Sequence, residues 1–110
     1  MIEGGCIQIK DIVAVGGKDF TACFGVDELM LGGLVFGGKA QISGNSNSLP
    51  EPFVQLYDAF TAGNLQRAQE LQQVVNQVIA LHQGGRTTAF FKATLELRGI
   101  SAGRVRAPMC

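Results

Sequence analysis

The sequence has no excess of charge of either sign. Lys and Arg together number 9, Asp and Glu together number 9, and the formal net charge is therefore 0. A protein that binds nucleic acid or an anionic membrane surface needs cationic side chains to neutralise the phosphate groups. We therefore expect no nucleic acid and no membrane among the partners of this chain.

Long hydrophobic runs and regularly spaced cysteines are also missing. No apolar stretch approaches the ~18 residues of a membrane-spanning helix, and the start, MIEGGCIQIK, has neither the basic residues nor the apolar run of a secretory signal. The three cysteines, Cys6, Cys23 and Cys110, are an odd number, which favours free thiols in a reducing compartment. These absences predict a soluble, cytoplasmic protein.

The sequence does contain enough hydrophobic residues for one core, and it contains many glycines. The chain has 110 residues, of which 46% are hydrophobic, so it can form one domain without disulfide bonds. The 15 glycines gather mainly in pairs between periodic segments, where they separate one structural element from the next. We expect a single domain with two parts, residues 1–47 and residues 48–110.

Residues 1–47 alternate between helix-like and strand-like segments. Residues 6–17 predict a short amphipathic helix, because their isoleucines and valines recur at helical spacing. Residues 19–25 (DFTACFG) predict a strand that is buried on both faces, as in a parallel sheet. A glycine-rich helix over residues 27–38 and a second strand over residues 40–44 follow, which is the rhythm of an α/β fold.

Residues 48–110 predict mainly helices. Ser48 and Glu51 have the spacing of a capping box at the start of one helix, and Asn64 is placed to cap the next. A last helix ends at Gly99, before an extended tail. The predicted core stripes of the first two helices are Phe53, Tyr57 and Phe60, and then Leu65, Ala68, Leu71, Val75, Val78 and Ile79.

Polar residues follow both predicted strands. Asp27 and Glu28 come after the first strand, and Ser43, Asn45 and Asn47 follow the second. Binding groups of α/β barrels lie at the carboxyl ends of strands, where carboxylates can accept hydrogen bonds from sugar hydroxyls and a polar loop can close on an anionic group. The alternative is that Asp27 caps the following helix, that Glu28 complements its dipole, and that the loop is polar only because loops are. The sequence pattern alone favours this alternative.

Two further candidates carry weaker signals. Residues 33–40 (GLVFGGKA) nearly match a phosphate-binding loop, but Ala40 lacks the hydroxyl for magnesium, and the stretch ends a helix instead of beginning one. The single histidine, His82, falls late in a predicted helix, where it could interact with the helix dipole. We expect no nucleotide, no metal ion and no cofactor.

Three segments carry a resemblance that extends over nearly the whole chain. Residues 25–38 (GVDELMLGGLVFGG) look like a seventh strand-to-helix junction, and residues 40–72 (AQISGNSNSLPEPFVQLYDAFTAGNLQRAQELQ) look like an eighth strand running into the eighth helix. Residues 91–108 (FKATLELRGISAGRVRAP) resemble a terminal helix with a Gly-x-x-x-Gly-x-x-Arg-x-Pro ending. Together these segments resemble the C-terminal part of the N-acetylneuraminate lyase and dihydrodipicolinate synthase family.

The resemblance implies a pyruvate-dependent class I aldolase on a (β/α)8 TIM barrel, in which a lysine forms a Schiff base with a 2-keto acid. The chain would supply helix six to strand eight in residues 1–47 and the C-terminal helices in residues 48–110. The implied substrate-binding residues are Gly25, Asp27, Glu28, Ser43 and Gly44. The position of the family's lysine falls just before Met1, so neither Lys10 nor Lys18 matches it, and we expect no catalytic residue within the chain.

Two classes of function remain open. In the first, the chain is the C-terminal fragment of a lyase or aldolase that acts on a 2-keto acid of sugar-acid, sialic acid or dihydrodipicolinate type, inactive alone and completed by a missing N-terminal barrel portion. In the second, the chain is a non-catalytic partial barrel that forms a homo-oligomer, because two strands leave both sheet edges unpaired. Phosphate binding by the loop after the second strand is a third possibility.

Overall fold

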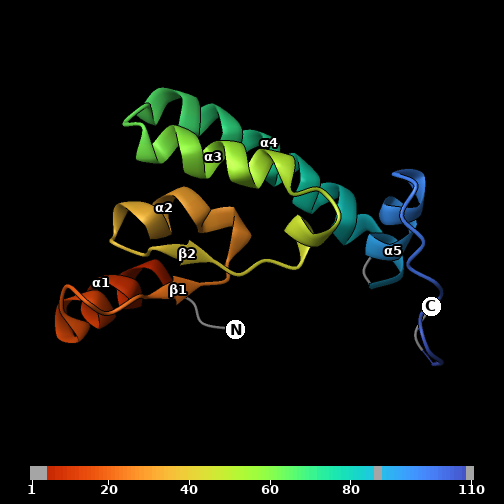
Figure 1. Ribbon diagram of the computed structural model, residues 1–110, viewed down its shortest axis with the longest axis horizontal. Helices are drawn as coiled ribbons and strands as arrows, with labels where there is room; N and C mark the ends of the chain where they lie inside the picture. The colour runs from red at the N-terminus through yellow and green to blue at the C-terminus, as the bar shows by residue number, and fades with distance from the viewer. Residues whose placement is uncertain (1–4, 86–87, 109–110) are drawn as a thin grey trace.

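The computed structural model in Figure 1 describes residues 5–85 and 88–108. Helices α3 and α4 run side by side along the top of the view, α2 lies beneath them, and the two strands and α1 lie below α2. Helix α5 and the C-terminal tail lie at one end of the molecule. In chain order the elements are α1 (Gly5–Gly16), β1 (Cys23–Phe24), the 3₁₀ helix η1 (Asp27–Leu29), α2 (Met30–Val35), β2 (Ala40–Gln41), the 3₁₀ helix η2 (Asn45–Asn47), α3 (Glu51–Thr61), α4 (Leu65–Gly85) and α5 (Thr88–Leu97).

Strands β1 and β2 form a parallel pair, and α2 connects them. Cys23 lies opposite Ala40 in the register, and Phe24 lies opposite Gln41. A parallel pair needs a crossover connection, which the glycine-rich segment between the strands provides as η1 and α2. The two predicted strands and the helix between them are therefore confirmed, although each strand is only 2 residues long.

The prediction that the first strand is buried on both faces is wrong for this chain. Phe24 packs against the helix side, where a Cβ added at Gly33 would lie 2.5 Å from the Phe24 ring and one at Gly38 would lie 2.6 Å from it. Thr21 and Cys23, on the other face, are exposed. Only glycine lets the backbone approach the ring this closely, so α2 seals one face of the strand pair and leaves the other uncovered.

The hydrophobic core lies between α2, α3 and α4. Leu56 of α3 and Val75 of α4 are fully buried at its centre. Full burial of one such side chain contributes about 1.5–3 kcal/mol, so this three-helix contact is the main source of stability. The buried core residues are Met30, Leu34, Phe53, Leu56, Leu71, Val75 and Ile79.

The junction between α3 and α4 confirms two expectations and corrects two others. Gly63 has a φ of 78°, which suits glycine after a helix, and the Asn64 side chain caps α4 by accepting a hydrogen bond of 3.0 Å from the Arg67 amide. Leu65 and Tyr57 were expected in the core but are exposed. The Tyr57 hydroxyl instead donates a hydrogen bond of 3.1 Å to the carbonyl of the residue before β2.

The predicted capping box at the start of α3 is wrong. Pro50 occupies the N-cap position, and no side chain caps the helix there. Ser48 and Glu51 are not paired in this way because Ser48 bonds to the loop and α4, and Glu51 bonds to Arg98.

Within 5–85 and 88–108, no helix combines the length and the apolar character needed to cross a bilayer.

Candidate functional site

The side chain of Asp27 ties together the segments that follow the two strands. It is only 6% exposed, and its carboxylate accepts three hydrogen bonds. Gln41 Nε2 donates to Oδ1 at 2.5 Å, Ser43 Oγ donates to Oδ2 at 2.7 Å, and Asn45 Nδ2 donates to Oδ2 at 2.6 Å. Hydrogen bonds to a carboxylate are roughly twice as strong as neutral ones, so this cluster fixes the two strand ends relative to each other.

The alternative interpretation of Asp27 as a helix cap is wrong. Val26 occupies the N-cap position of η1, and it makes no side-chain capping bond. Asp27 is the first residue of η1, and its carboxylate is directed to the other strand end. An acidic residue before a helix has the same local sequence pattern whether it caps the helix or bonds elsewhere. The hydrogen-bond partners of Asp27 lie 14 to 18 residues further along the chain, beyond the reach of that pattern.

The structure brings some of the predicted site residues together and leaves others at the edge. Asp27 and Ser43 are in direct contact, and Glu28 beside them is exposed. A Cβ at Gly25 would lie 3.3 Å from the Ile42 carbonyl oxygen, so this glycine keeps the two segments close. Gly44 lies in the β2 loop, which we define as residues 43–48.

Gln72 on α4 is a site residue that the sequence interpretation missed. Its Nε2 donates to the Asp27 carbonyl oxygen at 3.1 Å, and its Oε1 accepts from the Leu31 amide at 2.9 Å. Gln72 therefore bonds to the backbone at the start of η1 and in the first turn of α2. A signal was available, because Gln72 is a polar residue four after Ala68 and three before Val75, on the buried stripe of α4.

His82, near the end of α4, contacts the β2 loop through both ring nitrogens. It is 3% exposed, its Nδ1 lies 2.9 Å from Asn45 Oδ1, and its Nε2 lies 3.2 Å from Ser48 Oγ. The rings of Phe90 and Phe91 on α5 pack against the imidazole edge-to-face, with centroids 5.9 and 4.8 Å away. This burial lowers the pKa of His82 below its usual value, so the ring is neutral near pH 7.

Ser48, His82 and Asn45 have the order of a Ser-His-Asn catalytic triad, but the site cannot work as one. The Ser48 side chain is 0% exposed and its hydroxyl also lies 3.2 Å from the Asn45 carbonyl oxygen, so a substrate cannot reach it. A nucleophile must approach the reacting atom at hydrogen-bonding range. The three residues therefore form a structural contact between α4 and the β2 loop.

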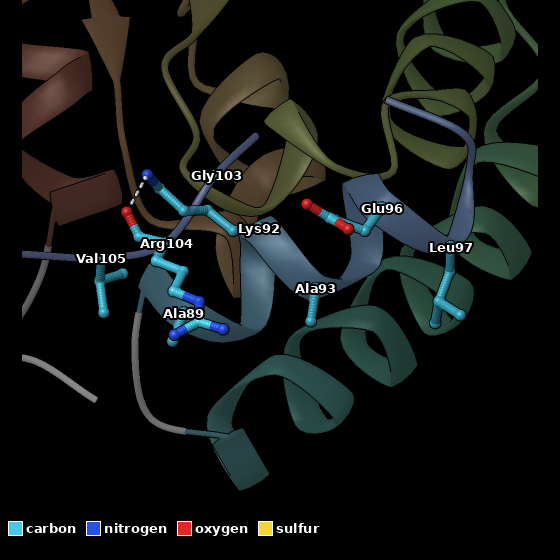
Figure 2. Close-up of a pocket in the computed structure, with 8 residues that line it drawn as sticks. All are labelled: Ala89, Lys92, Ala93, Glu96, Leu97, Gly103, Arg104 and Val105. Carbon is cyan, nitrogen blue, oxygen red and sulfur yellow. Dashed lines mark hydrogen bonds between the residues drawn. The ribbon is translucent and has the colours of Figure 1, made fainter. Parts of the chain in front are cut away.

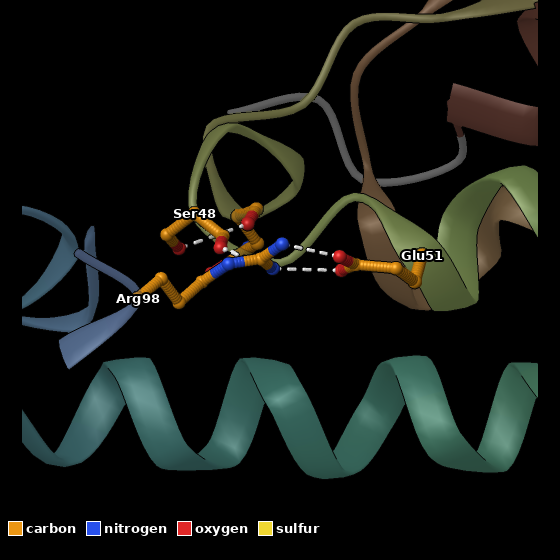
Figure 3. Close-up of polar contacts among 4 residues, drawn as sticks. Ser48, Glu51 and Arg98 are labelled. Carbon is orange, nitrogen blue, oxygen red and sulfur yellow. Dashed lines mark hydrogen bonds and ion pairs between the residues drawn. The ribbon is translucent and has the colours of Figure 1, made fainter. Parts of the chain in front are cut away.

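An ion pair between Arg98 and Glu51 lies at the end of the β2 loop, next to Ser48, as Figure 3 shows. Arg98, just after α5, donates through Nη1 to the Ser48 carbonyl oxygen at 3.0 Å and to Glu51 Oε2 at 2.8 Å, and through Nη2 to Glu51 Oε1. The hydrogen bonds from Arg98 lower the pKa of Glu51 to about 2. The fork of the guanidinium thus joins α5, the loop and the start of α3.

Away from the Asp27 cluster, a groove lies between α5 and the C-terminal tail, as Figure 2 shows. It is an open groove of about 850 Å³, and the Lys92 ammonium group at its wall donates to the Arg104 carbonyl oxygen at 3.1 Å. None of the residues of the Asp27 cluster lines it. The lining residues are Ala89, Lys92, Ala93, Glu96, Leu97, Gly103, Arg104 and Val105.

The described residues offer no metal centre and no lysine inside the Asp27 cluster. In ranges 5–85 and 88–108, no group of three or more His, Cys, Asp or Glu side chains could hold a metal ion. Lys10 on α1 pairs with the neighbouring Asp11, and Lys39 donates to the Lys18 carbonyl oxygen. Lys39 precedes β2, so it lies at the amino end of the strand, opposite to the cluster.

Comparison with known proteins places this geometry in a family. The model of the dihydrodipicolinate synthetase family matches residues 3–110. The chain is 32% identical over 107 residues to the 4-hydroxy-tetrahydrodipicolinate synthase of Archaeoglobus fulgidus, covering 97% of this chain and 37% of that protein. It is 29% identical over 114 residues to the N-acetylneuraminate lyase of Mediterraneibacter gnavus, covering 98% of this chain and 36% of that protein.

The same relationship holds for the fold. A solved structure of the Ruminococcus gnavus sialic acid aldolase, a catalytic lysine mutant, superposes with a TM-score of 0.88 at 25% identity, over 96% of this chain and 36% of that one. The fold is therefore part of a TIM barrel, mostly helical with two parallel strands. The chain belongs to the dihydrodipicolinate synthetase family, and it spans little more than a third of the length of these relatives.

Proposed function

We propose that this chain is the C-terminal part of the barrel of a Schiff-base-forming lyase or aldolase that acts on a 2-keto acid. Residues 1–47 run from helix six to strand eight, so that β1 and β2 are strands seven and eight. Residues 48–110 form the helical remainder of the same domain. In this role the chain supplies one wall of the substrate site.

The observation that carries the proposal is the Asp27 cluster. Parallel strands direct their carboxyl ends to the same edge, and barrel enzymes bind substrate at that edge. Asp27 and Ser43 follow β1 and β2, and they are joined by a hydrogen bond of 2.7 Å. The polar segments after the two strands are therefore held together as one surface at the edge where substrate binding is expected.

The residues of this surface have two roles in the proposal. Asp27 is buried and already accepts three hydrogen bonds, so it maintains the shape of the wall. Glu28 is exposed beside it and offers a carboxylate to the hydroxyls of the polyol part of the substrate. Gly25 after β1 and Gly44 beside Ser43 after β2 have no side chains, so they let a substrate approach the backbone closely.

We further propose that none of the lysines of this chain is the imine-forming nucleophile. Schiff-base lysines are activated by a desolvated pocket or a second cation. Lys10 has a half-exposed side chain and an acidic neighbour, and Lys39 lies at the amino end of β2. Lys92 lies in the groove against α5, outside the Asp27 cluster. The nucleophile then belongs to another part of the barrel.

Titration of the ¹⁵N-labelled chain with N-acetylneuraminate tests this function by NMR. We expect amide shifts confined to residues 25–28 and 43–47, and weaker binding in Glu28→Gln because the neutral amide loses the charge-assisted hydrogen bond. Glu96→Gln is the matched control, since Glu96 lines the groove of α5 and lies outside the wall. Shifts centred on that groove, or equal effects of the two variants, would contradict the proposal.

The second candidate function is that of a non-catalytic partial barrel that associates with itself. The observation that favours it is the uncovered face and edge of the strand pair, where Ile42 is 71% exposed and Thr21 and Cys23 are also exposed. Unpaired strand edges are templates for pairing with another chain. Sedimentation velocity over a concentration series should then show a reversible dimer that Ile42→Lys abolishes, and a monomer at every concentration would exclude this candidate.

A further inference from the structure

We propose that His82 is a positioning residue of the substrate wall. It holds the β2 loop at two points, and through Asn45 it sets the hydrogen bonding of the Asp27 carboxylate. The inference rests on the proposed function for its significance, since the loop matters to a ligand only if this wall binds one. The contacts themselves do not depend on that function.

The protons in the chain from Asp27 to His82 can be assigned from chemistry. Asp27 as a carboxylate can only accept, so the Asn45 group that lies 2.6 Å from its Oδ2 must be the amide nitrogen. The Asn45 oxygen then faces His82 Nδ1 at 2.9 Å, and this ring nitrogen must carry the hydrogen. The neutral imidazole is therefore the Nδ1–H tautomer, and its Nε2 is left as an acceptor.

The acceptor at Nε2 provides the second hold on the loop. Ser48 Oγ lies 3.2 Å from Nε2 and also 3.2 Å from the Asn45 carbonyl oxygen, so these two acceptors share its single hydrogen. The Thr94 hydroxyl on α5 lies 3.5 Å from Nε2 and donates to the Phe90 carbonyl oxygen at 3.0 Å instead. Asn45 begins η2 and Ser48 follows it, so His82 contacts both ends of this short helix. A rigid imidazole that is packed against two phenylalanine rings thus fixes the segment that directly follows Ser43 and Gly44.

Helix α4 positions both segments of the wall. Gln72 bonds to the backbone around η1, and His82 bonds to the side chains around η2. Ten residues of α-helix span about 15 Å, so the two side chains brace the wall at separate places along one rigid element. Loss of His82 should loosen the β2 loop and leave the contacts of Gln72 in place.

The test compares three variants of the full chain. His82→Leu removes both hydrogen bonds, and His82→Asn retains a donor near the position of Nδ1. Ile79→Ala is the matched control, because Ile79 is a buried residue of the same helix and belongs to the core between the helices. It destabilises the chain without removing a contact to the loop.

The measurement is amide hydrogen exchange by NMR at the hydrogen-bonded amides of Asn47 and Ser48 in the β2 loop and of Leu49 directly after it, relative to amides in the middle of α3. We expect His82→Leu to raise exchange in the loop by about tenfold more than in α3, and His82→Asn to recover most of this protection. Ile79→Ala should raise exchange in both segments together. Equal increases in loop and helix in His82→Leu would overturn the inference.

A parallel titration with N-acetylneuraminate separates this inference from the proposed function. If the wild-type chain binds the ligand, His82→Leu binds it more weakly and His82→Asn recovers the affinity, both the proposed function and the role of His82 are supported. If the wild-type chain does not bind, the proposed function fails, and the exchange pattern still decides whether His82 positions the loop. If binding is unchanged in His82→Leu although the loop is loosened, His82 is not a positioning residue for the ligand.

Discussion

The most informative perturbation is the removal of the Asp27 carboxylate. In Asp27→Ala, the donors on Gln41, Ser43 and Asn45 lose their common acceptor in a part-buried setting. Each donor left unsatisfied costs about 1–3 kcal/mol, and partial access of water to the two strand ends favours the low end of this range. We therefore expect Asp27→Ala to lower the free energy of unfolding by about 3–5 kcal/mol.

Asp27→Asn should lower the free energy of unfolding much less than Asp27→Ala, for a reason specific to this site. Gln41 Oε1 is buried without a hydrogen-bond partner among the described residues, because Gln41 Nε2 faces the carboxylate. In the Asn variant the new amide nitrogen can face Gln41, whose side-chain amide can rotate to accept from it, and the remaining oxygen still accepts from the β2 loop. Only the charge assistance is lost, which costs about 1–2 kcal/mol.

Urea unfolding followed by circular dichroism measures both variants against the wild type. The two expected losses differ by about 1–4 kcal/mol, about 2.5 kcal/mol at the midpoints of their ranges, which exceeds the error of the extrapolation for a small domain. A loss below about 1 kcal/mol in Asp27→Ala would show that the cluster does not hold the strand ends. An Asn variant as unstable as the Ala variant would refute the rotation of Gln41.

Three other predictions concern the core, the strand packing and pH. Leu71→Ala should destabilise by about 2–4 kcal/mol in urea unfolding, whereas Leu81→Ala on the exposed side of the same helix should change stability by less than about 0.5 kcal/mol. Gly33→Ala should cost about 1–3 kcal/mol in thermal unfolding, because its Cβ would lie 2.5 Å from Phe24, and Phe24→Leu in the same chain should recover part of the loss. Burial lowers the pKa of His82 in the folded chain below 6.5, its ordinary value. The unfolded chain therefore takes up a proton at a higher pH than the folded chain, and the free energy of unfolding should fall as the pH drops below 6.5. His82→Gln should flatten this slope below pH 6.5, and a wild type whose stability stays constant as the pH falls below 6.5 would contradict the burial of a neutral ring.

The order of the elements could be predicted because it depends on local patterns. The apolar stripe of α4, the glycine after α3 and the cap at Asn64 all act within a few residues of one another. The parallel pairing of β1 and β2 followed from two strand-like segments separated by one helix. The exposure of Cys23 could not be predicted in the same way, since a local sequence does not tell which neighbouring element covers a face.

The candidate site was only partly visible in the sequence because its contacts are long-range. The sequence singled out Asp27, but whether its carboxylate caps a helix or joins the two strand ends depended on donors more than ten residues away. Ser48 and Glu51 have the right spacing for a capping box, and longer-range partners took both side chains instead. Gln72 and His82 could have been found as polar residues on the buried stripe of a helix, which implies a partner for each.

Borohydride trapping of the purified chain with pyruvate, read by intact mass and peptide mapping, tests the proposed division of labour most directly. The proposed function predicts no specific adduct on any lysine of this chain, under conditions in which a full-length family member, used as the positive control, is trapped. A stoichiometric adduct on one of the chain's lysines, at Lys10, Lys18, Lys39 or Lys92, would show that the nucleophile lies within this chain and would contradict the proposal that the chain supplies only a wall of the substrate site.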